Sequence, residues 1–402
     1  MSVSEAFTEA LARLGPFGAE PRLAVAASGG ADSTALALLA HEFCAAQGGQ
    51  VLALIVDHGL RPESGAEAAL TAQRLSARGI GTQILTLSGL PRGARLQQAA
   101  RAARYEALAQ AAFAAGYLHL LLGHHAADQA ETVAMRAARG SGGLEGMAAW
   151  SARDKVLLLR PLLGVQPEAL RDYLRGLGMD WVEDPSNQAE KFERVRIRKA
   201  GQGLPPSGAA ERAAREVEDA AFLGRHAQIR PEGFALLDAG SVPQSALGAL
   251  IRSLGGTMYP PRQEKLAALA ARLRPATLGG VRIAPAGRLG PGWLLAREPA
   301  ACAPPVPAAQ GARWDSRFTL LAAPGPGYRF GPLGVDAGKF RRYNELPAAV
   351  LRAMPALRCP AGNIQFPVPV WFSPQVPVTA HPFVAYGQFI CADVGNLCRI
   401  PI

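Results

Sequence analysis

The sequence predicts an α/β fold whose N-terminal domain is built on a doubly wound parallel sheet. Short apolar runs alternate with helical patterns through the first 200 residues or so. The runs are continuously apolar, which is typical of strands buried on both faces of a parallel sheet. Polar side chains gather directly after the runs, at the strand ends where ligands bind in this architecture.

Each expected strand is followed by an expected helix. The strands are Arg22–Ser28, Val51–Gly59, Thr82–Gly89 and Leu118–His125. The helices are Ser33–Ala46, Glu63–Gly79, Arg95–Ala115 and Asp128–Arg139. A helix that follows each strand returns the chain to the same end of the sheet, so consecutive strands run parallel.

The character of the sequence changes near residue 201, and we expect three domains: 1–203, 204–300 and 301–402. The first is the α/β domain. The second is expected to be mainly helical, because Ala209–Ala227 and two further amphipathic segments occupy much of it, and a short β-like stretch, Gly279–Glu298, follows them. Proline and alanine dominate a break at Pro299–Ala312. The last domain is rich in glycine, proline and aromatic residues, so we expect a small β-rich module.

Composition narrows the class of protein. The net charge is +10 and the pI about 9.8. These values are expected either of a protein that binds a polyanion or of a protein that is basic overall and has no such partner. Five scattered cysteines form no CxxC pair and no zinc spacing, so we expect reduced thiols and a cytoplasmic location. The acidic N-terminus predicts no signal peptide, and no apolar run reaches the ~20 residues of a membrane span.

The stretch SGGADS (Ser28–Ser33) joins the first strand to the first helix. Adjacent glycines let backbone N–H groups approach an anion, and the helix N-terminus adds further donors. Asp32 would repel a bare phosphate, but it would suit a bound Mg²⁺. The stretch lacks the lysine of GxxxxGK[ST] and the spacing of GxGxxG. The alternative is an ordinary strand–turn–helix junction in which Asp32 or Ser33 caps the helix.

Three further motifs carry polar groups. VDHGLRPES places His58 at the end of the second strand, where it is a contact to the nucleotide or the substrate, or part of a loop. ARAARYEAL places Arg101 and Arg104 on one helix face, which is either an anion site or a solvated basic face. KFERVRIRK alternates three arginines, which are either a solvated surface or RNA phosphate contacts.

The densest polar constellation is GHHAADQAET. His124 and His125 end the fourth strand, and Asp128 and Glu131 share a face of the next helix. The spacing is not that of a zinc site. A pair of structural histidines is the alternative to a catalytic role.

SGGxDS is the signature of the PP-loop family of ATP pyrophosphatases, which share a Rossmann-like sheet. SGGADS, DHGLRPES, ARAARY, GHHAADQAET, RGSGGLEGM, RPLL and EDPSN with RxRxR follow in order across roughly residues 22–200. Together they closely resemble the tRNA(Ile)-lysidine synthetases. That resemblance implies ATP-dependent adenylation of the wobble cytidine of tRNA(Ile) with a CAU anticodon, followed by attack of L-lysine. The product, lysidine, switches the tRNA from methionine to isoleucine.

The resemblance also implies roles for single residues. The expected ATP-binding residues are Ser28, Gly29, Gly30, Ala31, Asp32, Ser33 and His58, with Asp32 holding Mg²⁺. The expected catalytic residues are Asp32, Arg101, His124, His125 and Asp128. Glu131 and Arg160 are expected to bind lysine, with Asp128 a further candidate. Arg104, Arg139, Arg194, Arg196 and Arg198 are expected to contact tRNA. Dimers are common in the family, so the resemblance suggests a homodimer.

Two positions depart from the family pattern HHxDDQ and its arginine helix. Ala127 replaces the first aspartate of the pair, and Gln97 stands where an acid is common. Among other functions, a tRNA 2-thiolation enzyme would need CxxC pairs, and an amidating synthetase would need an ammonia source. A non-catalytic RNA-binding protein would not need an intact SGGADS.

Overall fold

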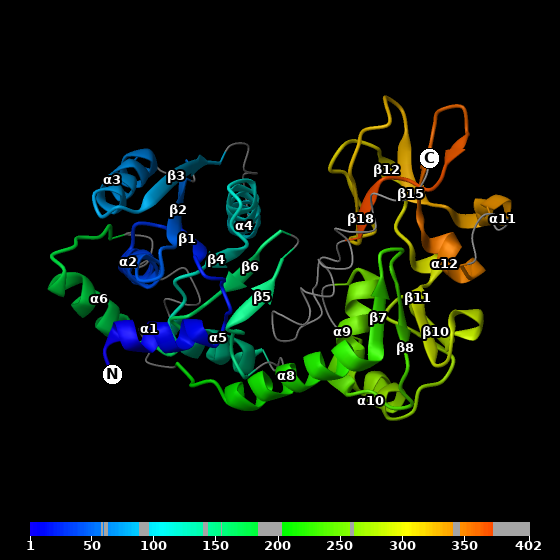
Figure 1. Cartoon of the computed structure of the whole chain (residues 1–402), viewed down its shortest axis with the longest axis horizontal. Helices are drawn as coiled ribbons and strands as arrows, with labels where there is room; N and C mark the ends of the chain where they lie inside the picture. The colour runs from blue at the N-terminus through cyan, green and yellow to red at the C-terminus, as the bar shows by residue number, and fades with distance from the viewer. Residues whose placement is uncertain are drawn as a thin grey trace. The chain divides into compact units, whose positions relative to one another are not determined.

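The computed structural model describes residues 1–57, 59, 63–87, 96–139, 144–153, 155–183, 203–257, 261–340 and 346–372. The chain divides into two compact units, Met1–Arg212 and Ala213–Ile402 (Figure 1). The three-domain division expected from the sequence stays a prediction, and its boundary at residue 300 falls inside the second unit. Within the described ranges, no helix is long and apolar enough to cross a membrane.

The first unit contains a six-stranded sheet of the predicted kind. In spatial order its strands are β3 (Gly81–Thr86), β2 (Gln50–Asp57), β1 (Arg22–Ala27), β4 (His119–Leu121), β6 (Leu157–Leu159) and β5 (Trp150–Ala152). All pairs are parallel except that of β5 with β6. The chain runs outward from β1 to β3 and then returns to the other side of β1. A topological switch point therefore lies between β1 and β4, where such folds bind ligands.

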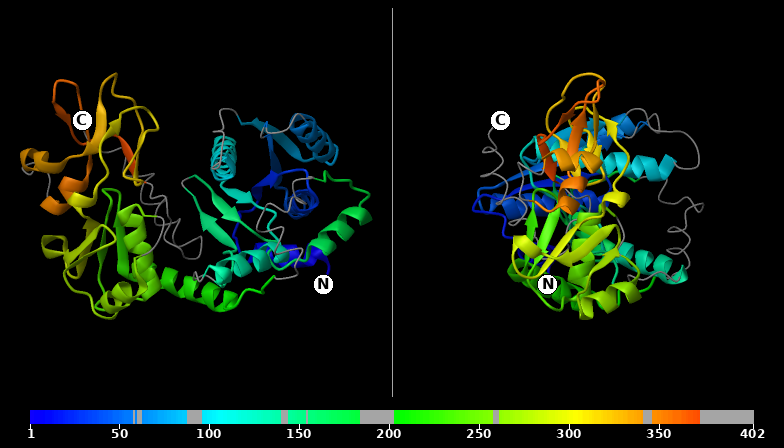
Figure 2. Two further views of the ribbon diagram at one scale, coloured as in Figure 1. Left: turned by 180° about the vertical axis from the view of Figure 1, so that it is seen from behind. Right: turned by 90° about the vertical axis from the view of Figure 1, so that its right-hand side faces the viewer.

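Helices cover both faces of this sheet. They are α1 (Val3–Ala12), α2 (Ala31–Ala45), α3 (Ser64–Ser76), α4 (Leu96–Ala114), α5 (Ala126–Ala138) and α6 (Pro167–Gly176). The four expected helices, α2 to α5, are confirmed with every end within three residues of its prediction. Figures 1 and 2 show α4 on one side of the sheet and α2 and α3 on the other. The helix α1 was not expected; a capping box between Ser2 and Glu5 begins it.

The strand β3 is not buried on both faces as its apolar run suggested. It is the edge strand and pairs with β2 alone, and Ile84 is 43% exposed. By contrast, residues Ala35 to Ala40 of α2 are all buried. This helix lies against β1, β2 and α6, and its small side chains allow close packing at the centre of the unit.

The second unit begins within α8 (Ala209–His226) and continues into a five-stranded antiparallel sheet. In spatial order the strands are β7 (Ala227–Arg230), β8 (Phe234–Leu237), β11 (Trp293–Arg297), β10 (Val281–Pro285) and β9 (Ala276–Leu278). Side chains from α9 (Gln244–Gly255) and α10 (Gln263–Ala271) share its hydrophobic core. The segment 204–300 therefore holds a sheet besides the expected helices. Two of its strands, β10 and β11, lie in the stretch expected to be β-like; the other three are three or four residues long, too short to show a clear alternating pattern.

The rest of the unit is β-rich, as predicted. A four-stranded sheet orders β12 (Val306–Pro307), β15 (Arg329–Pro332), β16 (Pro355–Arg358) and β17 (Ile364–Gln365). A three-stranded sheet orders β13 (Arg313–Trp314), β14 (Phe318–Leu320) and β18 (Val370–Phe372). The short helices are η2 (Gly287–Leu289), η3 (Pro299–Ala301), η4 (Gly334–Asp336), α11 (Ala337–Phe340) and α12 (Ala348–Ala353).

A buried ionic cluster links these parts of the second unit. Asp315 accepts hydrogen bonds from Arg297 Nε at 3.0 Å and Nη2 at 2.8 Å, and from Arg317 Nε at 2.8 Å. The Asp315 and Arg317 side chains are 2% and 1% exposed. Arg317 also donates to the carbonyls of Gly233 and Ala353. One carboxylate thus joins β11 to the β13–β14 hairpin and, through Arg317, to the β7–β8 turn and α12.

Candidate active site

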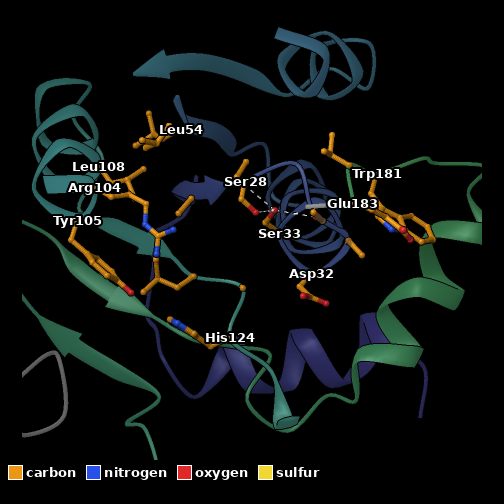
Figure 3. Close-up of a pocket in the computed structure, with 18 of the residues that line it drawn as sticks. Ser28, Asp32, Ser33, Leu54, Arg104, Tyr105, Leu108, His124, Trp181 and Glu183 are labelled. Atoms are coloured by element: carbon orange, nitrogen blue, oxygen red, sulfur yellow. Dashed lines mark hydrogen bonds between the residues drawn. The ribbon is translucent and has the colours of Figure 1, made fainter. Parts of the chain in front are cut away.

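A pocket of about 430 Å³ opens at the carboxyl end of β1, beside the switch point (Figure 3). One wall is the β1–α2 loop, a second is α4, and a third is the segment after α6. Its lining consists of Ala26, Ala27, Ser28, Gly30, Ala31, Asp32, Ser33, Leu54, Val56, Arg104, Tyr105, Leu108, Leu122, Gly123, His124, Arg171, Trp181, Val182 and Glu183. The apolar floor and polar walls suit a nucleotide, which has one apolar end and one anionic end.

The β1–α2 loop requires glycine at its first turn. Gly29 has φ +84°, and a Cβ there would lie under 3.0 Å from Thr71 Oγ1 and 3.3 Å from Val182 Cγ2. The Gly29 carbonyl also accepts a hydrogen bond of 2.8 Å from the Val182 N–H. Gly30, the N-cap of α2, lines the pocket, and a Cβ there would meet Ser28 Oγ at 3.6 Å and the Val182 carbonyl oxygen at 3.9 Å, which are ordinary contacts. Thr71 and Val182 therefore pack against one side of the loop, and its other side lines the pocket.

Ser33 organises the same loop from inside. Its hydroxyl accepts a 3.0 Å bond from the Ser28 N–H and donates to the Gly30 carbonyl at 3.1 Å. The Ser28 and Ser33 hydroxyls are also 3.0 Å apart. The orphan N–H groups at the start of α2 consequently face the pocket in a preformed cradle, which is what an anion needs.

Asp32, His125 and Asp128 meet at the N-termini of α2 and α5. His125 Nε2 lies 3.4 Å from Asp32 Oδ2, and His125 Nδ1 lies 3.7 Å from Asp128 Oδ2. The same Asp128 oxygen accepts a 3.1 Å bond from the His125 backbone N–H. Asp128 thus holds His125, which in turn touches Asp32. Gly123 allows this approach, because a Cβ there would lie 3.3 Å from the Asp32–Ser33 backbone.

The Asp32 side chain fits the expected Mg²⁺. Its Oδ1 is buried and has no hydrogen-bond partner within the described ranges, while the carboxylate lines the pocket. The described residues contain no group of three or more acidic, histidine or cysteine ligands for a metal. Mg²⁺ commonly takes one or two protein carboxylates and completes its shell with phosphate oxygens and water. A single aspartate beside a phosphate cradle therefore matches this ion.

The helix α4 contributes an arginine pair around an aromatic ring. Arg101 Nη2 donates to Tyr105 Oη at 3.3 Å, and the guanidinium carbons of Arg101 and Arg104 lie 5.2 and 5.7 Å from the Tyr105 ring centre. Figure 3 shows Arg104 and Tyr105 across the pocket from Ser28. Burial lowers the pKa of Arg104, and the neighbouring Arg101 lowers it further. A partly buried cation of this kind is stabilised by an arriving anion.

The residues expected to bind lysine lie away from the pocket lining. Glu131 is 3% exposed on α5, and Asp128 faces His125. Arg160 donates to the Ala148 carbonyl at 2.9 Å and to Ser151 Oγ at 3.4 Å. The structure thus brings Ser28, Gly30, Ala31, Asp32, Ser33, Arg104 and His124 together at the pocket, with Gly29 behind the loop and His125 beside Asp32.

Other predicted site residues lie elsewhere or outside the described ranges. Arg139 follows the last turn of α5 and is exposed. His58, Arg194, Arg196 and Arg198 lie outside the described residues.

The sequence reasoning missed the third wall of the pocket. Trp181, Val182 and Glu183 line it, together with Arg171 of α6. Of the described acids, only Asp32 and Glu183 belong to the lining. Trp181, Val182 and Glu183 begin the motif WVEDPSN, which is visible in the sequence, but only the Val182–Gly29 backbone bond shows that these three residues lie against the loop.

Comparison with known proteins places this site in a family. A model of the PP-loop domain matches residues 3–201. The tRNA(Ile)-lysidine synthase of Hyphomonas neptunium is 41% identical over 307 residues, which is 69% of this chain and 83% of that protein. The chain belongs to the tRNA(Ile)-lysidine synthase family.

Two further relatives cover more of the chain. The tRNA(Ile)-lysidine synthase of Ruegeria pomeroyi is 36% identical across 88% of this chain and 90% of that protein. The one from Mesorhizobium japonicum is 37% identical across 82% and 79%. The family resemblance inferred from the motifs is confirmed. The match also extends past the PP-loop domain into the second unit, where the sequence offered few motifs.

Proposed function

We propose that the protein ligates L-lysine to the wobble cytidine of tRNA(Ile) with a CAU anticodon, in two steps driven by ATP. The cytidine 2-carbonyl oxygen attacks the α-phosphorus of ATP, and pyrophosphate leaves. The lysine ε-amine then attacks C2, loses a proton and displaces AMP. The observation that carries the proposal is the preformed anion cradle of the β1–α2 loop, which shares one pocket with Asp32, Arg104 and His124.

The loop residues would hold the pyrophosphate portion of ATP. Backbone N–H groups at the N-terminus of α2 supply donors that need no rearrangement, and the Ser28 hydroxyl would turn from Ser33 to the phosphate. Bound Mg²⁺ would neutralise phosphate charge and strengthen pyrophosphate as a leaving group, with Asp32 holding it. The contact of His125 with Asp32 would keep that carboxylate aimed at the phosphates.

The walls on either side of the loop would stabilise charge that develops in the first step. Negative charge gathers on the α-phosphate as its bonds change, and Arg104 and His124, which line the pocket, would stabilise it. Arg101 would act beside Arg104 through their shared contact with Tyr105. Preorganised cations in a partly dry pocket lower the barrier without the cost of reorienting water.

Lysine needs an acid for its ammonium group and a base for the departing proton. We keep Asp128 and Glu131 as acids and Arg160 as the partner of the lysine carboxylate, from the sequence. Glu183 adds a third candidate acid, because it lines the pocket opposite α4. The variants Asp128→Asn, Glu131→Gln and Glu183→Gln separate the three: the KM for lysine should rise in the variant that has lost the ammonium partner, while pyrophosphate exchange continues.

The change from methionine to isoleucine identity, a cytoplasmic location and a homodimer belong to the same proposal. The test uses radiolabelled lysine, ATP and unmodified tRNA(Ile) with a CAU anticodon, with initiator and elongator methionine tRNAs as controls. Label should enter only the isoleucine tRNA, with one AMP formed for each lysine. Incorporation into none of the tRNAs refutes the activity, and equal incorporation into all refutes the specificity.

A further inference from the structure

Two polar side chains without a role in the proposed function, Gln129 of α5 and Arg212 of α8, hold the segment that leads into β5. We call residues 145–148 the β5 entry loop. Gln129 is 5% exposed and bonds to the backbone of Met147 in both directions. Its Nε2 donates to the Met147 carbonyl at 3.1 Å, and its Oε1 accepts from the Met147 N–H at 2.5 Å. One side-chain amide thus takes the place of a neighbouring strand at this position.

Arg212 holds the same loop with two of its nitrogen atoms. Its Nη1 donates to the Glu145 and Gly146 carbonyls at 3.2 and 2.9 Å, and its Nη2 donates to the Met147 carbonyl at 3.0 Å. Arg136 of α5 adds a 2.9 Å bond to the Gly146 carbonyl. Backbone carbonyls are obligatory acceptors, so side-chain donors on three successive carbonyls fix the path of the loop.

The loop is fitted to Gln129 at Gly146. This glycine has φ +78°, in the left-handed region that an L-residue adopts only with strain. A Cβ at this position would also lie under 3.0 Å from Gln129 Oε1. The Gln129 amide therefore reaches the loop backbone because residue 146 has no side chain.

The last carbonyl of the β5 entry loop holds Arg160, the residue expected to bind the lysine carboxylate. Arg160 Nη1 donates to the Ala148 carbonyl at 2.9 Å, and the Arg160 backbone N–H bonds to the Ala149 carbonyl at 2.7 Å. Arg160 directly follows β6, which runs parallel to β4 and therefore to β1. It thus lies at the edge of the sheet where the pocket opens. The orientation of its guanidinium group depends on where the loop places Ala148.

The remaining donors of Arg160 suit an incoming carboxylate. Its Nε is buried and has no hydrogen-bond partner within the described ranges, and both Nη atoms reach Ser151 Oγ only at 3.4 Å. Burial lowers the pKa of Arg160 to about 10, while Tyr105, which lines the pocket, opposes this shift. A carboxylate that arrives beside the guanidinium group would stabilise its charge and pair with its free donors.

We propose that Gln129 and Arg212 are positioning residues for lysine binding. They hold the β5 entry loop so that the Ala148 carbonyl orients the Arg160 guanidinium group toward the lysine carboxylate. This inference rests on the proposed function. Neither Gln129 nor Arg212 lines the pocket, so neither contacts ATP in the proposed binding mode. Their effect falls on the second substrate and passes through one backbone carbonyl.

The experiment separates the two steps of the reaction in the full chain. ATP–pyrophosphate exchange, measured with tRNA and without lysine, reports adenylation alone, and incorporation of labelled lysine gives the KM for lysine. Gln129→Leu and Arg212→Met remove the donors to the loop, and Arg175→Met, which removes an exposed arginine of α6, is the matched control. The KM for lysine should rise about tenfold in the first two variants and stay unchanged in the control. Exchange and the KM for ATP should match the wild type in all three.

Conservative variants and a second background test the route of the effect. Gln129→Glu keeps the size and an acceptor oxygen but loses the donor to the Met147 carbonyl, and Arg212→Lys keeps the charge but not the paired donors. Each should raise the KM for lysine less than Gln129→Leu or Arg212→Met does. In an Arg160→Met background, Gln129→Leu should leave the KM for lysine unchanged, because its effect passes through Arg160.

The outcomes distinguish the inference from the function on which it rests. The inference fails while the function stands if Gln129→Leu and Arg212→Met keep the wild-type KM for lysine, or if exchange falls together with lysine incorporation. It also fails if Arg160→Met keeps the wild-type KM, or if Gln129→Leu raises the KM by the same factor in that background. If the wild-type chain incorporates no lysine, the proposed function fails and the inference fails with it.

Discussion

Replacing Gly29 with alanine should damage the loop in two separable ways. A β-carbon at φ +84° costs about 1–2 kcal/mol, because an L-residue in the left-handed region brings Cβ close to a carbonyl oxygen. The same atom would also lie under 3.0 Å from Thr71 Oγ1, and overpacking of this kind costs about 1–3 kcal/mol. Together the two costs should lower the free energy of unfolding of the first unit by about 2–5 kcal/mol.

The overpacking cost can be removed without the backbone cost. In a Thr71→Ala background the clashing oxygen is gone, and Thr71 Cβ stays 3.5 Å from the new atom. Gly29→Ala should then cost mainly the backbone strain of about 1–2 kcal/mol, because the remaining tight contact, 3.3 Å from Val182 Cγ2, needs a shift of only a few tenths of an ångström. Thr71→Ala alone should cost less than Gly29→Ala, because within the described residues the hydroxyl donates to the Glu67 carbonyl of its own helix. The double-mutant cycle should give a coupling of about 1–3 kcal/mol.

Differential scanning calorimetry with and without ATP measures the backbone and overpacking costs. The transition that ATP raises belongs to the first unit, because a ligand stabilises the unit that binds it. For a unit of this size, 1 kcal/mol shifts the Tm by about 2–4 °C, so Gly29→Ala should lower that transition by about 10 °C. Equal losses in the wild-type and Thr71→Ala backgrounds would refute the clash. A loss below about 1 kcal/mol would refute both terms.

Three further predictions concern single side chains. Asp32→Ala should abolish ATP–pyrophosphate exchange without changing the circular dichroism spectrum, and retained exchange would remove Asp32 from the mechanism. Asp315→Asn should destabilise the second unit by about 3–5 kcal/mol, because it leaves two buried guanidinium groups unpaired; exposed Asp238→Asn is the control, and equal small effects would contradict this. Burial lowers the pKa of His119 to about 4, so stability present above pH 6.5 should fall by about 1–3 kcal/mol as pH drops toward 4. His119→Phe should remove this pH-dependent loss, and an unchanged acid profile would disprove the assignment.

The sequence by itself determined the features that local pattern records. Continuous apolar runs such as Val51–Gly59 became buried strands, and the helices between them ended close to their expected residues. SGGADS identified the loop, because positive φ at Gly29 and a helix start at Ala31 are consequences of a few adjacent residues. The order of motifs along the chain was sufficient to indicate the family. Each of these properties depends on neighbours in sequence.

Only the tertiary structure decided which side chains meet. Asp128 was expected to face lysine, yet it lies against His125, because α5 begins beside the start of α2. Arg160 gained backbone and hydroxyl partners and three arginine neighbours from segments that sequence pattern did not connect to it. Trp181 and Glu183 joined the pocket through one backbone hydrogen bond to Gly29, more than 150 residues away along the chain. Such contacts depend on sheet order and hairpin register, which arise when the whole unit buries its apolar surface together.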